Sequence, residues 1–472
     1  MTIRKLGLPW AAAGERNYCL PNSLLLTLAL GEAPERIPAI SDVRRGLARA
    51  AATLDGGPLD RLVKRYAGAV RIARVYGARA SMHRPGQRHT GFDALEHTCG
   101  LAGAFMLQVA VGTPIGTLVQ ELAQLSKVSH ASPNYVCVYP CDAPSSVDND
   151  WEPHLMVRAP EALAHEPGDS AVLLGLVDSG VVPEHPELAG RLRAGWDTVQ
   201  LDSDGVAPGI KLLGEHSHRD SNPLDHFVGH GMACAGIMSG LGLQLAPGLA
   251  GDAQIIPMRA LAAAQLPGRA NPVGLGAIAD LDAAVKLAVD LGAKVINMSF
   301  GTDDAALAPD SPKPHADVVA YAAAHGCILV AASGNNGLET RYWPAAHPEV
   351  IAVGAVGEDG LPTTFSTRGG HVALCAPGER ILSTGLAGYQ HVTGTSFAAP
   401  FVAAACALLV ARSARAAMPM DCSSVRALLA GACQPFPGKE VQGCGAGILD
   451  AAASLDALDA LIRREREETE DG

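Results

Sequence analysis

Residues 173–181 read LLGLVDSGV, an apolar run that ends on a carboxylate, Asp178, followed by a serine and a glycine. Short apolar runs of this kind recur along the chain, and stretches with helical spacing separate them. The alternation predicts an α/β fold with a mostly parallel sheet and helices on both of its faces. The further strand-like runs are 254–258, 294–298, 327–332 and 350–356, and the clearest helical stretches are 281–291 and 317–325.

The composition excludes several classes of protein. Of the 472 residues, 48% are apolar and 18% are charged, which excludes a largely disordered chain. The 36 basic and 48 acidic residues give a net charge of −12, so we expect no nucleic-acid partner, because phosphate binding needs a basic surface. The longest apolar run, 397–410, is too short to cross a bilayer, and we expect no membrane partner.

The eleven cysteines include no pair of Cys-x-x-Cys units, so we expect no zinc site and no other metal centre. The N-terminal apolar stretch is short and is interrupted by Pro9, so it makes no convincing signal peptide. We therefore expect reduced thiols and a cytoplasmic location, with secretion as the alternative.

The pattern divides the chain into an N-terminal extension, a small α+β module, a polar linker, a main α/β domain and a charged tail. The extension has no motif that carries chemistry, although it contains strand-like stretches at 24–30 and 70–76 and helical stretches at 41–51 and 59–69. The module has a helix with five apolar positions between two strands. The five parts are 1–100, of unknown role, 101–141, 142–152, 153–460 and 461–472.

Three polar residues stand where a ligand could reach them. Asp178 ends a strand, His230 lies between Gly229 and Gly231, and Ser396 begins a long apolar helix. Each alone has a simpler interpretation: a turn-capping aspartate, an exposed loop histidine and an N-cap serine. Together they supply a nucleophile, a base that takes its proton, and a carboxylate that orients the base.

The motifs around these residues, VDSGV at 177–181, GHG at 229–231 and GTSFAAP at 394–400, resemble those of the subtilisin-like serine proteases, the subtilases. The resemblance covers about 150–455 and implies a subtilisin-like catalytic domain over 153–460. VINMSFG at 295–301 resembles the substrate-binding strand of the family, which implies that Ser299, Phe300 and Gly301 lie along the bound peptide. AASGNNG at 331–337 resembles the oxyanion segment, which implies Asn335 as the oxyanion donor and Gly334 as a substrate contact.

The resemblance implies a serine endopeptidase that forms an acyl-enzyme on Ser396 and needs no cofactor for catalysis. One departure is that Met232 and Ala233 follow the His-Gly pair, where the family usually has threonine and histidine. A structural calcium is common in the family, but the acidic loop residues here do not have the spacing of a known calcium loop. Those residues are Asp202, Asp204, Asp303 and Asp304.

The module at 104–139, with Pro133-Asn134-Tyr135 shortly before the catalytic domain, also resembles the subtilase propeptide. This implies a zymogen whose N-terminal domain lies in its own cleft and which cuts itself between 139 and 151. A permanent accessory domain is the alternative for the module. For the whole chain, which is expected to act on proteins or peptides, the alternatives are a peptide ligase or macrocyclase that uses the same acyl-enzyme, and a catalytically silent peptide-binding scaffold.

Overall fold

The computed structural model describes most of the chain, and the regions it describes carry every residue of the expected triad. The linker expected at 142–152 lies mostly outside the described residues, as do Asp204 and most of the expected cutting region. The described ranges are 19–34, 36–80, 91–138, 151–203, 206–207, 209–217, 219–308, 310–438 and 441–470.

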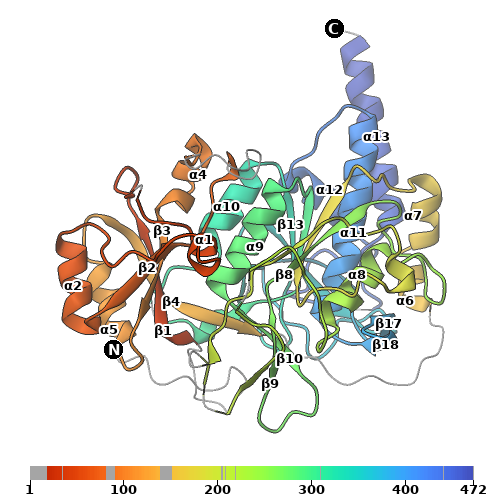
Figure 1. Ribbon diagram of the computed structural model, residues 1–472. Helices are drawn as coiled ribbons and strands as arrows, with labels where there is room; N and C mark the ends of the chain where they lie inside the picture. Colours follow the sequence, from red (N-terminus) through yellow and green to blue (C-terminus); the bar gives the residue numbers. More distant parts are fainter. Residues whose placement is uncertain are drawn as a thin grey trace.

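A seven-stranded sheet forms the centre of the main domain, and every pairing within it is parallel (Figure 1). Its β-rich runs are buried on both faces, as expected for parallel strands that helices cover. The expected α/β class is confirmed. The strand order is β16 (Val372–Pro377), β15 (Val350–Val356), β13 (Ile328–Ala332), β11 (Val295–Met298), β5 (Leu173–Asp178), β8 (Gln254–Arg259) and β6 (Trp196–Asp197).

Helices cover the two faces of this sheet. On one face α8 (His230–Ser239), α11 (Thr395–Arg415) and α13 (Ala451–Glu470) pack in a single apolar cluster with Leu174 and Leu176 of β5. On the other face α9 (Ile278–Asp290) and α10 (Ala316–Ala324) pack with Val177. Alternate residues of β5 therefore enter opposite cores, and the strand carries Asp178 to the carboxyl edge of the sheet.

Helix α11 is long and apolar enough to cross a membrane by length and composition alone. However, 83% of its most apolar window is buried inside the fold. It crosses the core between the sheet and the helices beside it, so it is a core helix that begins at the expected nucleophile.

The N-terminal residues form one unit in which helices and antiparallel strands alternate. Its strands lie in the order β2-β3-β1-β4, and two helices close one apolar core against them. The expected division at residue 100 does not follow this sheet, because strands from 19–74 pair with strands from 104–138. The elements are β1 (Cys19–Leu28), α2 (Pro58–Ala67), β2 (Val70–Arg74), β3 (Ala104–Val109), α5 (Ile115–Leu122) and β4 (Val128–Val138).

The sheet of the N-terminal unit continues into the main domain. The end of β4 pairs antiparallel with β10 (Val273–Ala277), and β9 (Ala262–Gln265) and β7 (Lys211–Leu213) extend the same sheet. In this register Val136 lies opposite Ala277, and Cys137 lies opposite Gly276. Both parts of the chain thus share seven strands in one sheet.

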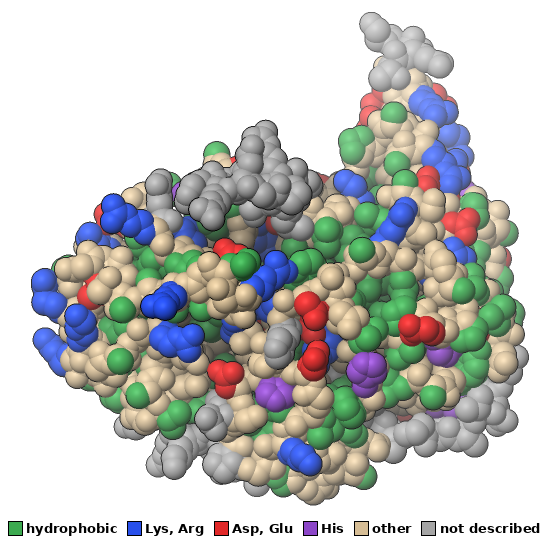
Figure 2. All heavy atoms as spheres, in the orientation of Figure 1, with side chains coloured by type: hydrophobic (Ala, Val, Ile, Leu, Met, Phe, Trp, Pro, Cys, Tyr) green, Lys and Arg blue, Asp and Glu red, His purple; other side chains and the backbone are tan. Residues whose placement is uncertain are grey.

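Helix α13 continues to Glu470, so the described part of the expected charged tail, 461–470, is helical. Its end projects from the body of the molecule, and both acidic and basic side chains cover it (Figure 2). The remaining helices and strands are α1 (Ile40–Arg44), α4 (Ala94–Thr98), α6 (Glu152–Met156), α7 (Ala159–His165), β12 (Thr302–Asp303), β14 (Tyr342–Trp343), β17 (Ile381–Gly385), β18 (Gly388–Val392) and α12 (Cys422–Ala432).

A buried histidine in α6 predicts acid sensitivity. His154 packs against Phe401 of α11 with ring centroids 4.9 Å apart, and neither ring nitrogen has a hydrogen-bond partner among the described residues. Burial lowers the pKa of His154 from 6.5 to about 4. As the pH falls through this window the unfolded chain takes up the proton first, so we expect the free energy of unfolding to decrease by about 3 kcal/mol.

Urea unfolding at pH 6.5 and pH 4 measures this effect. His154→Phe keeps an aromatic ring without a titratable nitrogen and should remove about 3 kcal/mol of the acid loss. The same change at the exposed His97 is the control and should leave the loss intact. An equal acid loss in His154→Phe and the wild type would show that His154 does not cause it.

Candidate active site

Asp178 is the last residue of β5 and is completely buried. Its Oδ1 accepts hydrogen bonds from the Ser179 backbone N–H and from His230 Nδ1, both at 2.7 Å. The start of α8 can come this close to β5 because residue 231 is glycine. A Cβ on Gly231 would lie 2.3 Å from the Gly180 carbonyl oxygen. The sequence therefore brings the carboxylate and the imidazole together through backbone contact.

His230 is the first residue of α8, after Gly229 in a left-handed conformation with φ of 77°. Its ring is buried, and the bond from Nδ1 to Asp178 fixes the tautomer that leaves Nε2 as the proton acceptor. The centroid of the Phe397 ring lies 4.9 Å from that of His230. Since Phe397 directly follows Ser396, this contact brings the start of α11 to the imidazole.

Ser396 lies in the first turn of α11, where the positive end of the helix dipole favours a developing negative charge. Its Oγ lies 3.4 Å from the Ser299 carbonyl oxygen, and its own carbonyl accepts a 2.7 Å hydrogen bond from Ser299 Oγ. The segment after β11 is thus tied to the start of α11. All three residues expected from the sequence meet at the carboxyl edge of the sheet, where α/β folds bind ligands.

Asn335 lies in the loop after β13 and is oriented by the residue before Ser396. Its Oδ1 accepts hydrogen bonds from both the backbone N–H and the hydroxyl of Thr395, each at 2.9 Å. The amide nitrogen faces the other way, 3.3 Å from the place where a Cβ on Gly394 would stand. Asn335 therefore presents an N–H donor beside the start of α11, as an oxyanion site there would require.

Family comparison agrees with this geometry: the model of the subtilase family matches residues 169–447. The chain belongs to the subtilase family. It is 35% identical over 250 residues to the thermophilic serine proteinase of Bacillus sp. (strain AK1), covering 52% of this chain and 53% of that protein. It is 32% identical over 257 residues to thermitase of Thermoactinomyces vulgaris, covering 54% and 80%. The chain thus spans about half of the length of the first relative.

Solved structures give the same result. A protease of Pseudoalteromonas arctica PAMC 21717 matches with a TM-score of 0.55 at 23% identity, over 67% of this chain and all of that one. The prenylagaramide maturation protease PagA matches with a TM-score of 0.51 at 25% identity, over 64% of this subtilase and 98% of PagA. The subtilase fold therefore extends through the main domain.

The expected substrate segment of the subtilase lies beside the nucleophile, with its side chains turned inward. Ser299 is fully buried, and Phe300 is 3% exposed and packs against His315, so only their backbone can face a peptide. Gly301, the next residue, is half-buried beside Tyr342 and Trp343. Gly334 is buried, and its N–H bonds Thr395 Oγ1 at 3.2 Å, so its side of the loop supports the start of α11.

Asp225 is a site residue that the sequence did not indicate. Its Oδ2 accepts hydrogen bonds from Ser179 Oγ at 2.7 Å and from the Gly229 N–H at 2.8 Å. Burial raises its pKa, which these hydrogen bonds oppose. Asp225 joins the turn after Asp178 to the loop before His230. The sequence signal for a role of Asp225 was its position five residues before His230. An aspartate in a loop is too common for that position to have predicted the role.

Cys234 is the fifth residue of α8, and its thiol lies under the site. Its Sγ lies 3.5 Å from the Ser396 carbonyl oxygen and 3.8 Å from Ser299 Oγ. Ligand atoms of Asp178, His230 and Cys234 all lie within 4.8 Å of one another in the described part of the chain. A thiophilic metal ion bound there would occupy the imidazole that the chemistry needs, so the group fits an inhibitory ion and not a resident cofactor.

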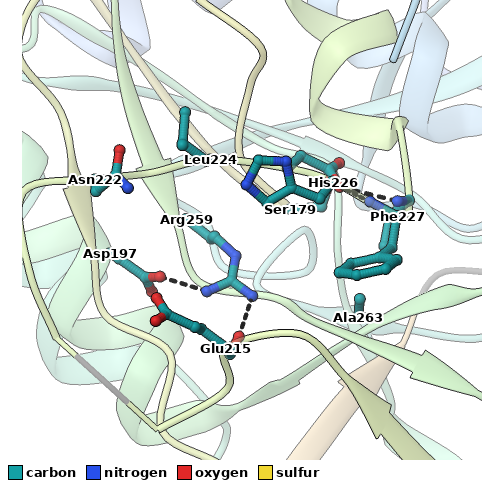
Figure 3. Close-up of a pocket in the computed structure, with 11 residues that line it drawn as sticks. Ser179, Asp197, Glu215, Asn222, Leu224, His226, Phe227, Arg259 and Ala263 are labelled. Carbon is teal, nitrogen blue, oxygen red and sulfur yellow. Dashed lines mark hydrogen bonds and ion pairs between the residues drawn. The ribbon is translucent and has the colours of Figure 1, made fainter. Parts of the chain in front are cut away.

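A pocket of about 90 Å³ lies next to the Asp178 turn (Figure 3). Arg259 crosses it and bonds both the Asp197 carboxylate and the Glu215 carbonyl, the latter at 2.7 Å. Burial raises the pKa of Asp197 to about 6, which the guanidinium opposes. Phe227 forms the opposite wall. The polar groups that line this pocket therefore mostly bond to one another.

The acidic residues considered for calcium bind protein donors. Asp304 Oδ1 accepts from Lys313 Nζ at 2.8 Å and from Trp343 Nε1 at 2.7 Å. Asp303 accepts from Thr340 Oγ1 at 3.2 Å and from Asn336 Nδ2 at 3.3 Å. The carboxylates of Asp303 and Asp304 are thus bonded to donors of the protein itself.

Asn335→Ala tests the oxyanion assignment. The substitution removes the N–H donor beside Ser396, and we expect kcat to decrease by about 10²–10³-fold, as for the equivalent subtilisin asparagine, with little change in KM. Steady-state peptide hydrolysis measures both constants. Asn336→Ala in the same loop is the matched control, since its side chain bonds Asp303 and Thr367. A loss below about 5-fold in Asn335→Ala would contradict the assignment.

Proposed function

We propose that this subtilase is a serine endopeptidase that hydrolyses peptide bonds through an acyl-enzyme on Ser396. The observation that carries the proposal is the 2.7 Å hydrogen bond from buried His230 to buried Asp178, beside the start of α11. A nucleophile at a helix N-terminus, a base with a fixed tautomer and a separate amide donor are the parts that acyl transfer needs.

In this mechanism Ser396 Oγ attacks the scissile carbonyl while His230 Nε2 takes its proton. Asp178 stabilises the imidazolium that forms, and it stays ionised. The Asn335 amide and the Ser396 N–H donate to the oxyanion. His230 then gives the proton to the leaving amine, and water hydrolyses the acyl-enzyme by the same route. The residues of the chain supply every step, so no cofactor is required.

A fluorophosphonate probe combined with peptide digestion tests this proposal. We expect one covalent adduct, located on Ser396 by peptide mapping, and loss of hydrolysis in proportion to labelling. An unlabelled Ser396 in a folded protein that has been cut between residues 139 and 151 and separated from its N-terminal unit would favour the catalytically silent scaffold, which binds peptides in the same cleft without cutting them.

We further propose that the enzyme is made as a zymogen whose N-terminal unit occupies its own cleft. The support is the antiparallel pairing of β4 with β10, because an extended substrate adds to a free strand edge in the same way. On its other side β4 meets the substrate segment, since Cys137 Sγ lies 2.9 Å from Thr302 Oγ1. A substrate peptide in the place of β4 would thus lie between β10 and the substrate segment.

Buried charges fix the N-terminal unit to the helices behind the cleft. Lys286 of α9 bonds Glu96 of the N-terminal unit at 2.6 Å and Asp290 at 2.8 Å, with all three side chains at most 3% exposed. Removing one partner would leave a buried charge uncompensated. This docking supports a folding template or inhibitor, and it serves a permanent accessory domain equally well.

Intact mass spectrometry decides between a zymogen and a permanent domain. We expect the wild-type chain to be cut between residues 139 and 151 on incubation, while Ser396→Ala stays full length. An active wild-type enzyme that remains intact would refute the zymogen and leave the accessory domain. Cutting in Ser396→Ala at the same rate would show that another protease is responsible.

A ligase or macrocyclase is the second candidate function. It is favoured by one structural relative, PagA, that is described as a maturation protease; the protease domain of PatA also matches, at 28% identity with a TM-score of 0.50. In this reaction an amine in place of water takes the acyl group from Ser396. The product mass distinguishes the two reactions, because hydrolysis adds one water and intramolecular aminolysis adds none.

We also propose a cytoplasmic enzyme that acts on proteins or peptides, without a nucleic-acid or membrane partner. Ten cysteines in the described ranges are free thiols, which supports a reducing compartment. The net charge of −12 supports the absence of a nucleic-acid partner, because phosphate binding needs a basic surface. Cell fractionation with an antibody to the protein tests the location.

A further inference from the structure

A buried ion pair beside the cleft has no part in the mechanism above. His315, the N-cap of α10, bonds the Asp282 carboxylate of α9 through Nδ1, and the two residues are 4% and 7% exposed. Burial alone would lower the pKa of His315, but the Asp282 carboxylate raises it to about 10. The imidazole therefore carries both protons at neutral pH, and its Nε2–H is a donor.

This donor faces the strand that occupies the cleft. His315 Nε2 lies 4.0 Å from Cys137 Sγ, and the same sulfur lies 2.9 Å from Thr302 Oγ1. Cys137 is completely buried and pairs with Gly276 of β10. The catalytic domain thus supplies a hydroxyl and an imidazolium, and the N-terminal unit supplies only the side chain between them.

We infer that Thr302 and the His315–Asp282 pair form a polar subsite that selects a small hydrogen-bonding side chain, serine, threonine or cysteine, at the substrate position that Cys137 occupies. The inference rests on the proposed function, because it takes β4 to lie where a substrate lies. It goes further by naming the side chain preferred at one position upstream of the scissile bond.

This preference is expected because a buried polar group without a hydrogen-bond partner costs binding free energy. An apolar side chain at this position would leave the Thr302 hydroxyl and the His315 Nε2–H without an acceptor, in a place that water leaves when the strand binds. The packing of Phe300 against His315, with centroids 5.6 Å apart, also limits the room for a large side chain. We expect serine to be preferred over valine by about 3- to 10-fold in kcat/KM.

Peptide-library digestion tests the subsite. The activated wild-type enzyme, Thr302→Val and Thr302→Ser cut the same library, and mass spectrometry reads the residues upstream of each cut. The mapped autoprocessing site shows how many residues upstream of the scissile bond Cys137 lies. If the enzyme does not cut itself, every upstream position in the library is compared instead. Serine, threonine and cysteine should be enriched at one position by the wild type and Thr302→Ser, and this enrichment should disappear in Thr302→Val.

Each outcome decides a different claim. No cutting of any peptide by the wild type would refute the proposed function itself. Cutting without this enrichment, or with an enrichment that Thr302→Val retains, would refute the subsite and show that His315 and Asp282 only join α10 to α9. If Thr302→Val does not fold, paired peptides with serine or valine at that position keep the test on the wild type, where equal kcat/KM would overturn the inference.

Discussion

Replacing Ser396 with alanine is expected to lower peptide hydrolysis by about 10⁶-fold, as in subtilisin. The substitution removes the oxygen that attacks the scissile carbonyl in the proposed mechanism, while the rest of the site keeps its shape. The residual rate should come from the Asn335 donor and substrate binding alone. Turnover of a peptide substrate measures the effect, and thermal unfolding checks that α11 still packs.

The matched control for this loss lies in the same helix. Ser413 is also buried, but its hydroxyl bonds the Val410 carbonyl at the far end of α11. Ser413→Ala should keep turnover within about 2-fold of the wild type, since nothing in the site contacts it. Turnover in Ser396→Ala at the wild-type rate would end the acyl-enzyme assignment.

Asp178→Asn is expected to lower kcat by about 10⁴-fold, the size of the loss in other triads. In the wild type one carboxylate oxygen accepts from both the Ser179 N–H and His230 Nδ1. An asparagine that keeps its amide oxygen at this position is neutral, so it no longer stabilises the imidazolium that forms when His230 takes the proton of Ser396. An asparagine that turns its NH₂ group there gives up the bond from Ser179 and holds the His230 proton on Nε2, which could then no longer accept the proton of Ser396.

The dependence on pH separates this effect from a loss of folding. Asp178→Asn should regain activity at high pH, where hydroxide can replace the base, while its unfolding transition stays close to that of the wild type. Asp252→Asn, at a carboxylate that is 62% exposed and pairs with Arg191, is the control and should change neither property. A loss below 10-fold in Asp178→Asn would show that Asp178 does not orient His230.

The main domain could be predicted because its elements are local patterns. Five of the seven parallel strands are short apolar runs that the sequence indicated, and Asp178, His230 and Ser396 each lie in a short motif rich in small residues. In the N-terminal unit the strand near residue 24, the helix near residue 59 and the strand from residue 70 were also expected. That these pair with 104–138 could not be predicted, because the pairing of Leu26 with Phe105 is long-range and leaves no periodicity.

In the functional site, too, the residues that lie in local motifs could be predicted and those brought together by long-range contacts could not. Asp178, His230, Ser396 and Asn335 could be found from motifs, and the structure brings them to one edge of the sheet. Thr302 and His315 do not belong to a recognisable motif. Both approach Cys137, which lies 165 residues from Thr302 and 178 residues from His315 along the chain. Such residues become visible only when distant segments are seen side by side.

The shared sheet has a consequence for any activated form of the enzyme. If β4 left its place, two rows of unpaired backbone N–H and C=O groups would appear at once, one on β10 and one on the departing fragment. Such rows are templates for pairing with other chains. The mature enzyme would then be prone to self-association whenever its groove is vacant, and a bound peptide should improve its solubility as well as its stability.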